Sequence, residues 1–133
     1  MSEDESSPEV HLYSREEVIE AFKPVVAMGV THPDQIAFID PVSRKAQRIL
    51  DSWAAQEERF SKGRGTVEAD LEYSLSRSTV HVDAGFTDPK FLEEVADNWL
   101  ATDLQRAKDA GLTGMVEKIQ AKIIAIKGGN KFS

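Results

Sequence analysis

The chain of 133 residues contains no cysteine. Disulfide bonds, thiolate nucleophiles, cysteine-based zinc sites and iron–sulfur clusters are therefore excluded. No apolar run approaches the roughly 20 residues that cross a bilayer, and the acidic first ten residues lack the apolar core of a signal peptide. We therefore expect a cytoplasmic protein without a membrane partner.

Histidine is scarce, with only His11, His32 and His81. None of them shows the H-x-x-x-H, H-x-H or E-x-x-H spacing of metal sites. No serine lies in a nucleophile motif, and no glycine pattern matches a dinucleotide or Walker loop. The sequence therefore predicts no metal, no cofactor and no catalytic residue, and it favours a noncatalytic protein over an enzyme.

The net charge of −7 argues against nucleic acid as a partner, because phosphate binding needs clustered cations. The charge is nevertheless arranged in blocks. Residues 1–20 carry seven acids and one base, and residues 66–110 carry ten acids and four bases. Residues 41–65 carry six bases and three acids, and residues 111–133 carry four lysines and one acid. Such blocks are typical either of solvated helix faces or of a charge-matched partner, including a second copy of the chain.

Apolar residues recur at helical spacing along most of the chain, with capping residues and glycines between the periodic segments. Ser14 and Glu17 form a capping-box pattern at the start of the first segment. The sequence predicts about five helices in a small all-α bundle or orthogonal array. We expect a single domain at 13–128, a flexible acidic tail at 1–12 and a C-terminal tail at 129–133, after Gly128 and Gly129 stop the last helix.

The tetrapeptides F-I-D-P and F-T-D-P occur at residues 38–41 and 86–89. An Asp followed by a Pro is the arrangement of an N-cap and the first residue of a helix. This repetition therefore indicates two helix starts rather than two copies of a ligand motif. We expect Phe38 and Phe86, two residues before each cap, to pack back over the first helical turn.

Residues 66–84 are the one segment whose secondary structure is ambiguous. Apolar and polar residues alternate from Thr66 to Ser76, as in a β-strand. The residue types favour a helix, and Val67, Leu71 and Leu75 form a row at i, i+4 spacing. We predict a helix capped by Thr66, with an α+β fold containing a β-hairpin at about 66–84 as the alternative.

A glycine-rich basic segment at residues 59–68 precedes this expected helix. Its cations and a helix N-terminus would suit a phosphate, sulfate or carboxylate group. The candidate anion-binding residues are Arg59, Lys62, Gly63, Arg64, Gly65 and Thr66. A plain link between two helices explains the same composition. The alternative function that this segment supports is a small-anion or nucleotide-responsive regulator, or a weak enzyme.

The two tryptophans, Trp53 and Trp99, both fall on apolar helix faces, which favours burial. If one is exposed instead, it becomes the natural anchor of a protein interface. The sequence predicts a noncatalytic helical protein that acts through protein–protein interaction, as an adaptor, regulator or assembly subunit, and that is able to self-associate. The candidate interface residues are Arg44, Arg48, Trp99, Leu100 and Asp103.

Overall fold

The computed structural model describes residues 12–131, with side chains described as far as residue 128. Every regular element in this part of the chain is helical, and no strand occurs in it. The predicted all-α fold is therefore confirmed. The acidic tail predicted at 1–12 lies outside the described residues except for Leu12.

The first helices begin where the sequence places their caps. Helix α1 (Arg15–Ala27) starts with the predicted capping box, in which Glu17 N–H donates to Ser14 Oγ at 3.1 Å. A 3₁₀ turn, η1 (Pro33–Gln35), lies in the connection to the long helix α2 (Pro41–Arg64). Asp40 caps α2 by accepting a 3.1 Å hydrogen bond from Ser43 N–H, with Pro41 at the first helical position.

The ambiguous segment is a helix, α3 (Val67–Ala84), and the β-hairpin alternative is wrong. The Thr66 hydroxyl accepts a 3.0 Å hydrogen bond from Ala69 N–H, as expected for an N-cap. Of the predicted i, i+4 row, Leu71 is buried and Val67 is exposed. The residues therefore follow helix propensity and not the alternating pattern.

The second Asp-Pro pair starts a helical rod of three consecutive elements, α4 (Pro89–Glu94), the π-helical turn η2 (Val95–Trp99) and α5 (Leu100–Asp109). Asp88 caps the rod by accepting hydrogen bonds from the N–H groups of Lys90 and Phe91. Counting this rod as one helix, the described residues contain five, as predicted.

The last helix, α6 (Thr113–Lys131), runs past Gly128 and Gly129. The predicted helix end at these glycines is therefore wrong. Glycine in a helix costs about 1 kcal/mol relative to alanine, which disfavours a helix without forbidding it. Residues 132–133 of the predicted C-terminal tail lie outside the described part.

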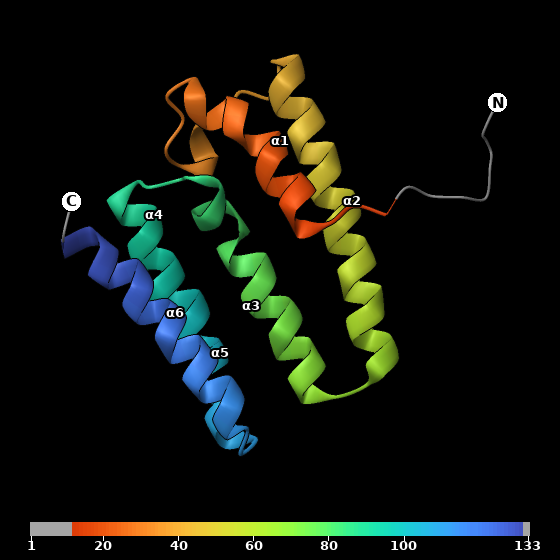
Figure 1. Cartoon of the computed structure of the whole chain (residues 1–133), viewed down its shortest axis with the longest axis vertical. Helices are drawn as coiled ribbons and strands as arrows, with labels where there is room; N and C mark the ends of the chain where they lie inside the picture. The colour runs from red at the N-terminus through yellow and green to blue at the C-terminus, as the bar shows by residue number, and fades with distance from the viewer. Residues whose placement is uncertain (1–11, 132–133) are drawn as a thin grey trace.

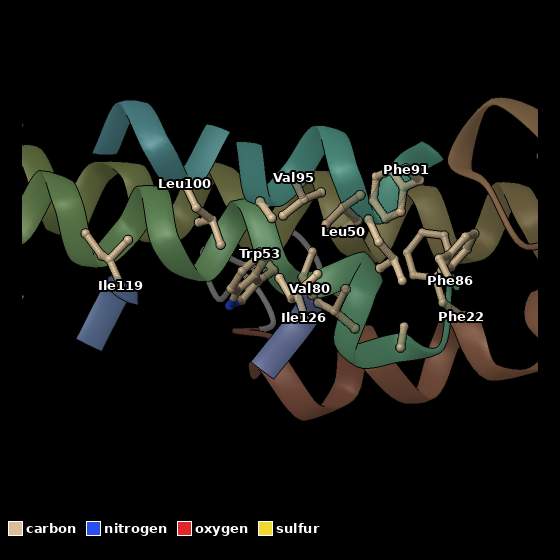
Figure 2. Packing of buried hydrophobic residues seen from close by; sticks show 14 of the residues in the cluster. Phe22, Leu50, Trp53, Val80, Phe86, Phe91, Val95, Leu100, Ile119 and Ile126 are labelled. Carbon is tan, nitrogen blue, oxygen red and sulfur yellow. The ribbon is translucent and has the colours of Figure 1, made fainter. Parts of the chain in front are cut away.

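Helix α3 is central in the bundle, with α1 and α2 against one side and α5 and α6 against the other (Figure 1). One apolar core fills the space between these helices, and Figure 2 shows Phe22, Leu50, Trp53, Phe86 and Phe91 among its members. Trp53 is only 2% exposed, so its predicted burial is confirmed. No helix within residues 12–131 is long and apolar enough to cross a membrane.

Candidate functional site

The π turn η2 changes which residues of the α4–η2–α5 rod face the core. In an uninterrupted α-helix, Trp99 would lie on the same face as Val95, four residues earlier. Here Leu100 N–H donates to the carbonyl of Val95, five residues earlier, so Leu100 takes that buried place. Val95 and Leu100 are fully buried, whereas Trp99 is 41% exposed, so the predicted burial of Trp99 is wrong. Single π turns of this kind occur frequently at functional sites.

An open depression of about 400 Å³ lies beside the exposed indole, between α3 and the η2–α5 segment. We call this depression the Trp99 site. Its lining consists of polar side chains and the indole: Ser74, Ser78, Asn98, Trp99, Thr102 and Asp103. The indole ring packs against Phe91 in a T-shaped pair, with ring centroids 6.2 Å apart and ring planes at 81°. One part of the indole thus contacts the core while another part remains open to solvent.

Asp103 is the most buried polar residue of the Trp99 site, at 4% exposure. Ser74 Oγ donates a 2.6 Å hydrogen bond to Asp103 Oδ2, and the Arg106 guanidinium lies 3.9 Å from Oδ1. Burial raises the pKa of the Asp103 carboxyl, while the Ser74 hydrogen bond and the Arg106 charge act in the opposite direction. The site therefore holds a carboxyl group whose ionised form is poorly solvated.

The remaining polar groups of the Trp99 site are available to a ligand. Ser78 Oγ and the Asn98 side-chain amide make no hydrogen bond to the described residues, and Thr102 Oγ1 donates to the Asn98 carbonyl at 2.7 Å. Oxygen acceptors beside an exposed indole suit an ammonium or guanidinium group, through hydrogen bonds and a cation–π contact. A positive charge would also compensate the Asp103 carboxylate.

The predicted interface residues are only partly brought together. Trp99 and Asp103 share the Trp99 site, whereas Leu100 is fully buried, so its predicted place at a surface is wrong. Arg44 and Arg48 are exposed near the start of α2, a helix that packs mainly against α1 and α3. Four further residues of the Trp99 site were not predicted from the sequence: Ser74, Ser78, Asn98 and Thr102. Ser74 and Ser78, and likewise Asn98 and Thr102, are spaced i, i+4 and so share a helix face, and this spacing was the only indication in the sequence that they belong together.

The glycine-rich segment is nearly all helical. Helix α2 continues through Gly63 to Arg64, and only Gly65 and Thr66 link it to α3. Lys62 lies 3.4 Å from Glu58 and Arg64 lies 3.1 Å from Glu72. Arg59 is exposed, while the Thr66 hydroxyl occupies the start of α3. Two of the three predicted cations are therefore paired within the chain, and anion binding here stays a prediction.

The described histidines lie apart from the Trp99 site. His81 is buried against Phe22 and Phe86, with ring centroids 5.1 and 5.2 Å away. Burial, aided by the charge of Arg77, lowers the pKa of His81 to about 4. His32 Nδ1 accepts a hydrogen bond from Asp34 N–H in the η1 turn. Among residues 12–131, no cluster of three or more His, Asp or Glu side chains could hold a metal ion.

Comparison of the chain with protein-family models, with curated protein sequences and with solved structures found no match. The function of the chain is therefore inferred from its sequence and from the geometry of its fold.

Proposed function

We propose that this chain is a noncatalytic binding protein of the cytoplasm, an adaptor or regulator, whose Trp99 site binds a basic side chain of a partner protein. The observation that carries the proposal is the half-exposed Trp99 on a π turn, next to the buried carboxyl of Asp103. Tryptophan is enriched among the residues that dominate binding energy at protein interfaces. The absence of cysteine is compatible with a reducing compartment.

An arginine or lysine side chain fits this site better than an apolar one. Its charge would lie over the indole face and within reach of the Asp103 carboxylate, the Ser78 hydroxyl and the Asn98 amide oxygen. The same arrangement disfavours an acidic side chain, because a second negative charge beside a buried carboxylate is repelled. The acidic net charge of the chain favours the approach of a basic partner as well.

Selection of a random peptide library on the wild-type protein, with counter-selection on Trp99→Ser, tests the proposal. We expect enriched peptides to contain Arg or Lys, and their affinity to fall about tenfold or more in Trp99→Ser and Asp103→Asn. Phe60→Ser is the matched control, since Phe60 is 60% exposed at the far end of α2. Enrichment without basic residues, or equal affinity of wild type and Trp99→Ser, would contradict the proposal.

Self-association is the second part of the proposal and uses another surface. A groove of about 510 Å³ runs between α3 and α6, with Leu75, Ala121 and Ala125 in its lining and with Glu72 and Lys118 among its charged residues. Ile124 on α6 is 68% exposed. Sedimentation equilibrium should detect a dimer of the wild-type protein that Ile124→Lys dissociates. A wild-type protein that stays monomeric at high concentration would contradict the proposed self-association.

A further inference from the structure

The loop that leads into α2 and the first turn of α2 together expose three large apolar side chains within five residues. Phe38, Ile39 and Val42 are 48%, 86% and 41% exposed. The equivalent phenylalanine of the second Asp-Pro helix start, Phe86, is fully buried. Phe38 is therefore left about half exposed, unlike Phe86, although the sequence predicted the same packing for both. We call residues 38–42 the apolar tip.

The residues that follow the apolar tip in the sequence include three basic side chains and no acidic one. Residues 41–50 contain Arg44, Lys45 and Arg48, and the first acid along α2 is Asp51. Arg44 and Arg48 are exposed, four residues apart on one face of the helix, and neither forms an ion pair with the described residues. Lys45, by contrast, lines a pocket together with Glu16, Glu17 and Glu20 of α1, so the two arginines are the unpaired cations beside the tip.

Asp40 is the one acid inside the apolar tip, and its charge is compensated locally. Its Oδ2 accepts hydrogen bonds from Ser43 N–H at 3.1 Å and from Ser43 Oγ at 3.2 Å. The N-terminus of α2, to which these groups belong, carries the positive end of the helix dipole. Asp40 therefore opposes an approaching anionic surface much less than a free carboxylate would.

We propose that the apolar tip, together with Arg44 and Arg48, binds the surface of an anionic lipid bilayer. The start of α2 lies at one end of the long axis of the bundle, where a flat surface can reach it (Figure 1). Phe38 and Ile39 enter the boundary between headgroups and acyl chains, and the two arginines lie among the phosphates. Apolar insertion and cationic attraction together give a stable peripheral contact that either alone would not.

The sequence predicted no membrane partner because it lacks a spanning segment, but a surface contact does not require one. The two ends of α2 differ in charge pairing, and this difference favours the end with the apolar tip as the membrane contact. Phe60 is also exposed at the opposite end, but Lys62 and Arg64 are paired with Glu58 and Glu72, so Arg59 is the one arginine beside it that is unpaired within the described residues. Only the end that carries the apolar tip combines exposed apolar side chains with two unpaired arginines on one helix face.

Co-sedimentation of the full chain with lipid vesicles tests the proposal. We expect binding to vesicles of equimolar phosphatidylcholine and phosphatidylserine, and little binding to phosphatidylcholine alone. Phe38→Ser/Ile39→Ser and Arg44→Gln/Arg48→Gln should each lower the partition coefficient about tenfold or more, since each cation near such a surface contributes about fivefold. Binding should also fall as NaCl rises from about 0.1 M to about 1 M, where the Debye length shrinks from about 10 Å to about 3 Å.

Phe60→Ser is the matched control and should sediment as the wild type does, and circular dichroism confirms that each variant keeps its helicity. The absence of wild-type binding to the anionic vesicles would overturn the proposal. Equal binding of the wild type and Phe38→Ser/Ile39→Ser would overturn it as well. Asp103→Asn should leave vesicle binding unchanged, which separates this result from any failure of peptide binding at the Trp99 site.

Discussion

The hydroxyl of Ser74 donates a 2.6 Å hydrogen bond to the buried carboxylate of Asp103 and thereby joins α3 to α5. The two residues are 29 positions apart in the chain. The hydrogen bond stabilises the ionised carboxylate, whereas burial disfavours it. It also fixes the carboxylate in the wall of the Trp99 site.

Ser74→Ala should therefore destabilise the protein by about 1–3 kcal/mol at neutral pH, because a buried charged acceptor loses its donor. The pKa of Asp103 should rise further in this variant, since the Ser74 hydrogen bond lowers it. Urea unfolding and carboxyl NMR titration measure the two effects. Ser78→Ala is the control on the same helix and should change stability by no more than about 0.5 kcal/mol. Equal effects of the two substitutions would show that the Ser74–Asp103 hydrogen bond contributes little.

The two tryptophans should differ in both fluorescence and stability. Trp53 is 2% exposed and Trp99 is 41% exposed. In Trp53→Phe the remaining Trp99 should emit at longer wavelength and be quenched by acrylamide, and in Trp99→Phe the remaining Trp53 should resist quenching. Trp53→Ala should cost about 3–5 kcal/mol, and Trp99→Ala about 1–2 kcal/mol. Equal quenching of the two single-tryptophan variants would contradict the exposure of Trp99.

The buried imidazole of His81 should make the protein sensitive to acid. The pKa of His81 is lowered to about 4, so the unfolded chain binds a proton at higher pH than the folded protein does. Stability should therefore fall as the pH drops from about 6.5 to about 4, by up to about 3 kcal/mol. Asp103 acts in the opposite sense, because its raised pKa favours the folded state as it becomes protonated.

NMR titration of the His81 ring measures this pKa directly, and urea unfolding across the pH range measures the stability. His81→Leu should flatten the loss of stability between pH about 6.5 and about 4. A His81 pKa near 6.5 in the folded wild-type protein would refute the prediction.

Two glycines at the α2–α3 junction should respond to alanine in opposite directions. Gly65 ends α2 with φ of +66°, a left-handed conformation that costs an L-residue about 1 kcal/mol or more. Gly63 lies within α2, and an added Cβ would meet no atom within 4 Å at either position. Gly65→Ala should therefore destabilise by about 1 kcal/mol, and Gly63→Ala should stabilise by about 0.5–1 kcal/mol. Thermal unfolding of the pair checks this, and a stabilising Gly65→Ala would contradict the junction geometry.

The sequence by itself determined the helical fold and the points where its helices begin. Ser14, Asp40, Thr66 and Asp88 all act as the caps that local residue patterns predicted, because capping depends on neighbours within three or four positions. The burial of Trp53 followed in the same way from the apolar periodicity of an uninterrupted helix.

Only the tertiary structure decided which helix faces are buried. The π turn places Leu100 in the core and leaves Trp99 half exposed. It shifts by one residue which positions face the core, and the 3.6-residue periodicity of the sequence does not predict such a shift. Phe38 and Phe86 each lie two residues before an Asp-Pro helix start, yet only Phe86 is fully buried, against Phe22 of α1 and His81 of α3. Burial depends on what lies opposite a residue in space. Neither the Trp99 site nor the apolar tip could therefore be located from the sequence, although some of their residues could be named.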